Sequence, residues 1–273
     1  MSINALWGPP PKSLIINNLQ KSASRFPPAS PVPTFRVVNN YSRKFPCAFS
    51  VCVLRLGMIN DISTMKTKDA LEFVGGLSSP SKMPCHGYSI SAKHCVTGQK
   101  LRNVANSICS KCYALKGHYS YPVVQNALQK RLDSLSSPLW VKTMVAVILA
   151  KEKSGFFRWH DSGDLQSVEH LQKIVDVCNG TQAIKHWLPT REFGIVGQFV
   201  RGGGIIPENL TVRFSALTFD GAPPISAAKK LGVQVSSASK ENFDCPASKQ
   251  GNTCADCRAC WNKNSFNITY KRH

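Results

Sequence analysis

From Phe156 to about Val235 the chain alternates short β-favouring apolar segments with segments that have a helical period. Strands are expected at 156–160, 183–188, 210–217 and from 233, and helices at 167–178, 192–200 and from Pro223-Pro224 to Gly232. A repeated strand–helix–strand order implies parallel strands joined by right-handed crossovers. The expected fold is α/β, with repeated βα units that form a partial or complete parallel barrel-like core; an open doubly wound sheet is the alternative. The chain contains no Gly-rich dinucleotide fingerprint.

Ahead of this alternating region, two further helices are expected, at 121–135 and, with Ser137-Pro138 as its start signal, up to about Lys153. We therefore predict one α/β domain over 61–273, with cysteine-rich segments at 83–118 and 245–262. The longest apolar run, Met144–Ala150, is closed by Lys151 and Glu152 and is too short to span a membrane.

Residues 1–60 form a basic leader rich in Pro, Ser and Asn, with seven basic residues and no acidic one. We expect this leader to be disordered, because it offers too little apolar surface to offset its ordering entropy. An organellar transit peptide and an upstream extension of the reading frame, with the true start at Met58 or Met65, are the other interpretations. The leader carries +7 of the formal charge of +19, so the rest of the chain carries +12.

The eleven cysteines bear most of the chemical information. In a chain too large to need disulfide staples they indicate a reducing compartment and thiols that bind metal. Eight fall into two sets: Cys85, Cys95, Cys109 and Cys112, and then Cys245, Cys254, Cys257 and Cys260. The second set has two successive two-residue spacers, which favours an iron–sulfur cluster over zinc.

The first set is less specific. Cys109 and Cys112 form a good pair, but nine residues separate Cys85 from Cys95, and the adjacent His86 and His94 could replace a cysteine as ligand. Zinc or a cluster would suit this arrangement. The three-cysteine pattern of radical enzymes is incomplete, since Ala105 stands where its first cysteine would fall.

Four segments resemble the phage gene-product-88 family: Met83–Tyr88, Ser107–Gly117, Arg158–Leu165 and His186–Arg191. The resemblance covers about residues 75–262 and leaves the leader outside. It implies a phage or prophage origin and a cysteine-ligated site. The Cys-x-x-Cys-Tyr-Ala sequence ahead of a βα core is also, more distantly, similar to phage iron–sulfur proteins related to radical-SAM enzymes.

Polar residues follow the first two expected strands. His160, Asp161 and Asp164 come after the first, and Arg191 after the second. Since the carboxyl ends of parallel strands form the ligand-binding face, we predict a catalytic site of His160, Asp161 and Arg191, with acid–base and anion-binding roles. Asp164 is expected to cap the following helix, and His118, His170 and His273 to lie at the surface.

Two functions from different classes remain. The first is an iron–sulfur protein with a [4Fe–4S] cluster, acting on a small molecule as a redox or radical enzyme at the strand ends; SAM would be a cofactor only if the incomplete motif were filled by Cys85 or Cys95. The second is a zinc-stapled nucleic-acid-binding protein without catalysis, suggested by the +12 core and by tyrosines interleaved with Lys111 and Lys116. Membrane insertion is not expected, the oligomeric state is left open, and the expected location is the cytoplasm of a phage host, or an organelle if the leader is a transit peptide.

Overall fold

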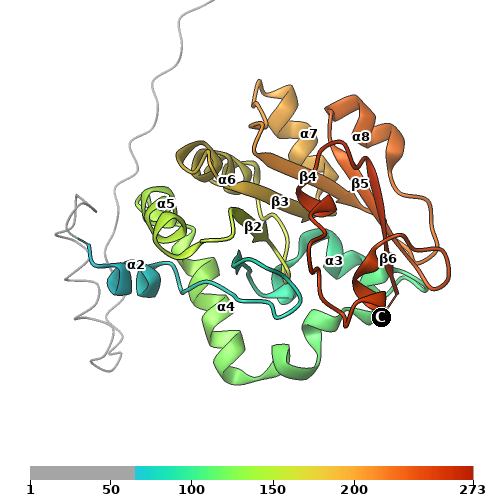
Figure 1. The fold of residues 1–273 in the computed structure, drawn as a ribbon, viewed down its shortest axis with the longest axis horizontal. Helices are drawn as coiled ribbons and strands as arrows, with labels where there is room; N and C mark the ends of the chain where they lie inside the picture. The colour runs from blue at the N-terminus through green and yellow to red at the C-terminus, as the bar shows by residue number, and fades with distance from the viewer. Residues whose placement is uncertain (1–64, 273) are drawn as a thin grey trace, which may run out of the picture. The chain divides into compact units, whose positions relative to one another are not determined.

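The computed structural model describes residues 65–272; the leader predicted at 1–60 lies outside this range. The described chain contains a six-stranded sheet in which all neighbouring strands are parallel and follow one another in chain order (Figure 1). The strands are β1 (Gly87–Tyr88), β2 (Phe156–Trp159), β3 (Lys185–Thr190), β4 (Leu210–Ser215), β5 (Gln234–Ser239) and β6 (Asn267–Lys271).

Seven α-helices lie in residues 65–272, together with six short 3₁₀ helices. The α-helices are α2 (Thr67–Phe73), α3 (Val96–Leu101), α4 (Pro122–Ser134), α5 (Trp140–Lys151), α6 (Val168–Gly180), α7 (Phe193–Arg201) and α8 (Ile225–Leu231). Within that range no helix is long and apolar enough to cross a membrane.

One face of the sheet is covered by a row of helices. Because each crossover has the same hand and the strand order never reverses, α6, α7 and α8 pack on the same face, and α5 extends the row beside α6 (Figure 1). Alternate residues of each strand point into this layer; in β4 they are Leu210, Val212 and Phe214. These side chains form the main core with the apolar faces of the helices.

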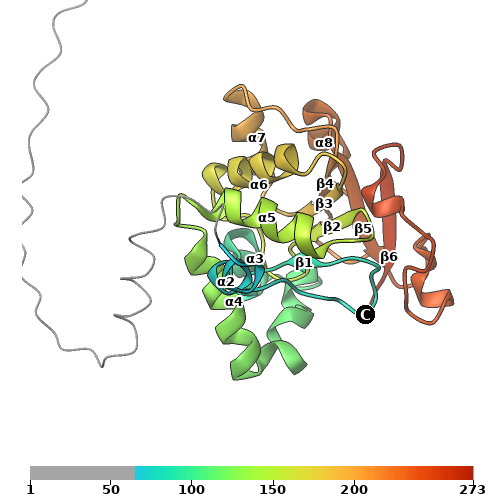
Figure 2. The same ribbon diagram turned by 60° about the vertical axis from the view of Figure 1, so that its left-hand side comes forward.

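The opposite face of the sheet is covered by the C-terminal segment, which we define as residues 245–262 (Figure 2). The intervening residues of β4 hold it: Thr211 Oγ1 donates to the Trp261 carbonyl at 2.9 Å, and Arg213 Nη2 donates to the Ala259 carbonyl at 2.9 Å. A second apolar cluster forms beneath it. Its members are Cys85, Trp187 and Trp261, packed with Met83, Phe156, Cys260 and Tyr270.

The α/β fold with parallel βα units is confirmed, and the doubly wound alternative is wrong, because the strand order has no reversal. Barrel closure is not shown: within residues 65–272, β1 and β6 are the two edges of an open sheet. Most expected elements lie within two residues of their predicted bounds. The helix expected from Ser137 begins at Trp140, since the Ser137 hydroxyl first accepts the Leu139 amide in a turn. The strand expected at 183–188 spans 185–190, because Ile184 still belongs to a turn closed on the Thr181 carbonyl.

Candidate functional site

His160 follows β2 with φ at 53°, a left-handed conformation that is uncommon outside glycine. Its side chain is buried, with its ring 5.3 Å from that of His170 on α6. Neither ring nitrogen finds a hydrogen-bond partner among the described residues. Burial, and then the charges of His170 and Arg158, place the pKa of His160 well below its ordinary value. His160 is therefore a neutral ring packed against α6.

Asp161 is bound by tyrosines of the cysteine-rich segment. Tyr119 Oη donates to Asp161 Oδ2 at 2.8 Å, Tyr113 Oη donates to the Asp161 carbonyl, and the Asp161 amide donates to Ser89 Oγ at 3.2 Å. The other carboxylate oxygen, Oδ1, is buried and has no hydrogen-bond partner in residues 65–272. Asp161 thus fixes the tyrosines that follow Cys112 to the end of β2 and keeps one acceptor free.

Asp164 joins the loop after β2 to the end of β3. Its carboxylate accepts the Leu165 amide at 2.8 Å, Thr190 Oγ1 at 2.6 Å and the Arg191 amide at 2.8 Å. Burial raises the pKa of Asp164 to about 6. The expected helix-capping role of Asp164 is wrong, since the cap of α6 is Ser167, whose Oγ accepts the His170 amide at 3.1 Å.

Gly163, within the same loop, allows this loop to approach closely the segment that follows β1. It has φ at 81°, and a Cβ there would lie 2.7 Å from the Ile90 carbonyl oxygen. No residue with a side chain would fit at this position without moving the backbone.

Arg191 begins the loop after β3. Its Nε donates to the Ala216 carbonyl at 3.2 Å, and its charge acts on the Cys109 thiol, opposing the rise that burial causes in the pKa of that group. The next residue, Glu192, accepts Thr97 at both carboxylate oxygens, each at 2.7 Å. Since Thr97 lies in the first turn of α3, Glu192 anchors the start of that helix, and with it Cys95, to the strand ends.

Three thiols gather beside this edge of the sheet: Cys95, Cys109 and Cys112, here called the strand-end thiols. Burial, followed by the charges of Asp164, Cys112 and Cys109, raises the pKa of Cys95 to about 12. The loop that carries Cys109 is attached to the chain after β4, because the Ile108 amide donates to the Leu217 carbonyl at 2.9 Å.

Gly98 on α3 packs closely against two of these cysteines. A Cβ at this position would lie 3.6 Å from Cys95 Sγ, 3.8 Å from Cys109 Sγ and 2.8 Å from Cys95 Cβ. Both sulfurs are therefore near a single point that any side chain at residue 98 would fill. Glycine at this position therefore permits the close packing of α3 against these two cysteines.

Cys85 does not lie with the first set, and its grouping with Cys95, Cys109 and Cys112 is corrected. It packs in the second apolar cluster with Cys260, and burial, followed by the charges of Glu152 and Cys254, raises the pKa of its thiol to about 12. Strand β1, two residues downstream, pairs with β2 and carries Cys85 to the face that the C-terminal segment covers. The cause is topological, and cysteine spacing does not reveal it.

The thiols on the same face as Cys85 belong to the C-terminal segment. Burial and then the charges of Cys245 and Cys257 raise the pKa of Cys254, and the Cys254 amide donates to the Lys82 carbonyl at 2.8 Å. Cys260 Sγ lies 3.3 Å from Tyr270 Oη. We call Cys85, Cys245, Cys254, Cys257 and Cys260 the C-terminal thiols.

His86 and His94, which could each replace a cysteine as ligand, lie in different surroundings. His86 Nδ1 lies 3.1 Å from Glu152 Oε2, and the His86 amide donates to the same oxygen at 2.7 Å. A carboxylate on one ring nitrogen is the usual support of a metal-binding histidine, and it leaves Nε2 as the ligand atom. His94 closes a 3₁₀ helix (Ala92–His94) directly before Cys95.

Thiols are side chains that bind metals as thiolates, but in this structure they do not converge on a single metal ion. Within residues 65–272 no three His, Cys, Asp or Glu side chains come close enough together to hold one metal ion. Burial favours the neutral thiol at Cys85, Cys95 and Cys260, whereas a bound cation would favour the thiolate. Of the predicted ligands, three lie beside the strand ends and five on the opposite face, and neither group converges on one point.

Several residues of these surroundings escaped the sequence interpretation. They are Tyr119, Gly98, Glu152, Arg158 and Glu192, which carry no motif of their own. Apart from Gly98, whose nearest contact is Cys95, they have partners far away in the chain. The only signal was proximity: Tyr119 follows the Cys109–Cys112 pair, and Glu192 follows Arg191. No hydrogen bond or ion pair within the described chain joins His160, Asp161 and Arg191 to one another, so their joint catalytic role stays a prediction.

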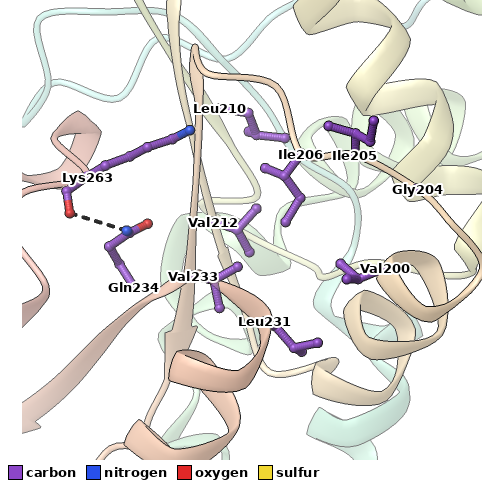
Figure 3. Close-up of a pocket in the computed structure, with 11 residues that line it drawn as sticks. Val200, Gly204, Ile205, Ile206, Leu210, Val212, Leu231, Val233, Gln234 and Lys263 are labelled. Carbon is purple, nitrogen blue, oxygen red and sulfur yellow. Dashed lines mark hydrogen bonds between the residues drawn. The ribbon is translucent and has the colours of Figure 1, made fainter. Parts of the chain in front are cut away.

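A cleft lies at the other end of the strands, where β4 and β5 begin (Figure 3). Apolar residues line most of it, including Val200, Ile206, Val212 and Leu231, with Lys263 at its rim. Lys263 Nζ donates to Glu208 Oε2 at 3.0 Å. The cleft contains none of the cysteines and no residue of the predicted catalytic site.

Fold and site together define an α/β protein with sequentially ordered parallel strands and two separate groups of cysteines, one at the carboxyl ends of β2 and β3 and one on the face opposite the helices. The model of the gene product 88 family matches residues 59–263. The chain belongs to that family. No curated protein and no solved structure matches the chain.

Proposed function

We propose that this chain is an iron–sulfur protein that acts as a redox or radical enzyme on a small molecule at the carboxyl ends of β2 and β3. The observation that carries the proposal is that Cys95, Cys109 and Cys112 lie near one another beside the strand ends, with α3 packed closely against Cys95 and Cys109 at Gly98. Ligand sites of parallel α/β proteins lie at this edge of the sheet.

The lack of convergence of the thiols on one point favours a cluster over zinc. Structural zinc sites use four ligands in tetrahedral array around one ion, whereas each iron of a [4Fe–4S] cluster takes its own thiolate, so the sulfurs need not converge on one point. The strand-end thiols number three, and such a set leaves one iron of the cluster without a cysteine. A bound cluster supplies one-electron chemistry at its accessible iron.

The residues around the strand-end thiols would position and shield a substrate. Asp161 Oδ1 is a buried acceptor without a partner in residues 65–272, so it is available to a hydrogen-bond donor of the substrate. Arg191 lies within electrostatic range of Cys109 and has guanidinium donors beyond the Nε that Ala216 occupies, which suit a carboxylate or phosphate. The Tyr113 and Tyr119 rings pack edge-on at 5.8 Å over this side and would restrict access of water.

A second candidate, a zinc-stapled nucleic-acid-binding protein, is favoured by one observation. Tyr121 is 52% exposed and packs against His118, close in sequence to the exposed Lys116. Exposed aromatic rings among cations suit base stacking and phosphate contact.

Anaerobic purification with iron, sulfide and zinc analysis separates these candidates. The proposal predicts iron and acid-labile sulfide in the unaltered protein and a marked loss of both in Cys109→Ala. The matched control is Cys178→Ala, which removes a fully buried thiol of the main core. A colourless protein with stoichiometric zinc would exclude the enzyme proposal, and a salt-dependent DNA titration would then test the second candidate.

A further inference from the structure

A cavity separate from the apolar cleft of Figure 3 lies between the C-terminal segment and the end of β6. Its volume is about 320 Å³, near the lower end of the roughly 300–1,000 Å³ typical of small-molecule sites. Three cations line it: Lys82, Lys271 and Arg272. Ser248 and Asn252 add a hydroxyl and an amide side chain, and no acidic residue of the described range lines the cavity.

Backbone hydrogen bonds fix the segments that surround this cavity. The Cys254 amide donates to the Lys82 carbonyl at 2.8 Å, which joins the C-terminal segment to the chain ahead of β1. The Cys245 amide donates to the Thr269 carbonyl of β6 at 3.1 Å. The fold therefore brings the three cations to one cavity from distant positions in the chain.

These cations have no carboxylate partner among residues 65–272, because the ion pairs of that range join other residues. Lys82 and Arg272 are half-buried, and Lys271 is exposed. The Arg272 guanidinium stacks on the Phe219 ring at 4.2 Å, and Lys271 Nζ lies 5.6 Å from the centre of the Phe243 ring. An aromatic ring attracts a cation but carries no net charge that would neutralise it.

Two carboxylates on adjoining segments are bound by other donors. Asp220, on which the charge of Arg272 acts, accepts Ser239 Oγ at 2.6 Å and the Lys240 amide at 3.2 Å. Asp244 accepts the Thr269 amide at 2.8 Å. The residues that line the cavity therefore leave its positive charge unbalanced, and an anion placed between the cations would relieve their mutual repulsion.

We propose that this cavity binds a small molecule through a phosphate monoester group. A monoester carries a charge near −2 at pH 7 and offers three acceptor oxygens. Arg272 suits two of these oxygens through paired N–H donors, and the lysines supply point charges. The cations surround a single cavity, whereas a single-stranded nucleic acid is followed by a groove that tracks its backbone. The inference is independent of the proposed function, since it requires no metal at the cysteines.

The test is isothermal titration calorimetry of the full chain at low ionic strength with ribose 5-phosphate, inorganic phosphate and unphosphorylated ribose. We expect both phosphates to bind and ribose not to bind. Lys82→Gln and Arg272→Gln are each expected to weaken the binding of ribose 5-phosphate by about tenfold, because each removes charge-assisted hydrogen bonds. The control Lys142→Gln removes the same charge from an exposed position on α5 and is expected to leave the affinity unchanged.

Absence of binding of ribose 5-phosphate at millimolar concentration would overturn the proposal, as would an affinity that both cavity variants leave unchanged. Equal weakening in Lys142→Gln would also overturn it, because the effect would then reflect overall charge. If Arg272→Gln does not fold, Lys82→Gln decides by the same criteria. A decathymidylate oligonucleotide is titrated in parallel. If it binds, and weakens in the cavity variants, while ribose 5-phosphate does not bind, the cavity serves nucleic acid and the proposal is wrong.

Discussion

Acid is expected to destabilise this protein through three buried neutral histidines, His160, His170 and His186. Burial lowers the pKa of His170 and His186 to about 3, and that of His160 well below its ordinary value. In the unfolded chain each imidazole takes up a proton near pH ~6.5, whereas in the folded chain it does not. The unfolded state therefore binds more protons, and the free energy of unfolding falls as the pH falls from about 7 toward 3.

The size of the effect follows from these shifts. Between pH 7 and pH 5 each histidine costs about 2 kcal/mol of stability. Asp164 acts in the opposite direction, since its pKa is raised to about 6 and its protonation in the folded state returns about 1 kcal/mol over the same interval. The net loss is about 4 kcal/mol, a large share of the roughly 5–15 kcal/mol that stabilises a typical domain.

Urea unfolding followed by tryptophan fluorescence at pH 7, 6 and 5 measures this loss. His186→Gln, in which an amide replaces the ring that lies 2.8 Å from Thr181 Oγ1, is expected to reduce the loss by about 2 kcal/mol. His118→Gln, a change at an exposed histidine, is expected to leave it unaltered. Comparison among these variants cancels any contribution from the thiols, which all of them share. An equal pH dependence in His186→Gln and the unaltered protein would refute the reasoning.

Three further changes test the packing around the two groups of cysteines. Arg213→Leu leaves five backbone carbonyls without their donor and is expected to lower the free energy of unfolding by about 4 kcal/mol. It is also expected to speed proteolysis within the C-terminal segment. Unchanged protease resistance would show that Arg213 does not hold this segment on the sheet. Gly98→Ala places a Cβ 2.8 Å from that of Cys95 and is expected to reduce the iron content after anaerobic purification, whereas Gly194→Ala, at a glycine with open space, is not. Glu192→Gln weakens two hydrogen bonds from Thr97 by about 1–2 kcal/mol in total, and hydrogen exchange should accelerate at the amides of α3 but not of α4.

Local patterns predicted the parallel α/β core well, because its strands and helices are set by residues close together in the chain. Gly232, for example, ends α8 with φ at 66°, as its position after the helical segment indicated. The edge strands β1 and β6 were not expected. β1 has only two residues, and β6 becomes recognisable through its pairing with β5 rather than through its own sequence.

The surroundings of the cysteines were harder to predict, because they depend on contacts between distant segments. Cys85 is close to Cys95 in sequence, yet the pairing of β1 with β2 directs it to the opposite group of thiols. His170 was expected at the surface and is buried, which corrects that prediction. The helical period identified the side of α6 that faces the sheet, but His170 packs beside that side against Trp140 of the neighbouring α5, with ring centres 6.4 Å apart.

The covering of the second sheet face by the last part of the chain has a consequence for biosynthesis. Trp261 donates through its indole N–H to the Phe157 carbonyl, 104 residues earlier. The segment around Trp261 covers Cys85. During translation β1 to β5 and their helices leave the ribosome before the C-terminal segment does. The face that carries Cys85, Arg158 and Trp187 therefore stays open on the nascent chain, and any metal loading of the C-terminal thiols must follow completion of synthesis.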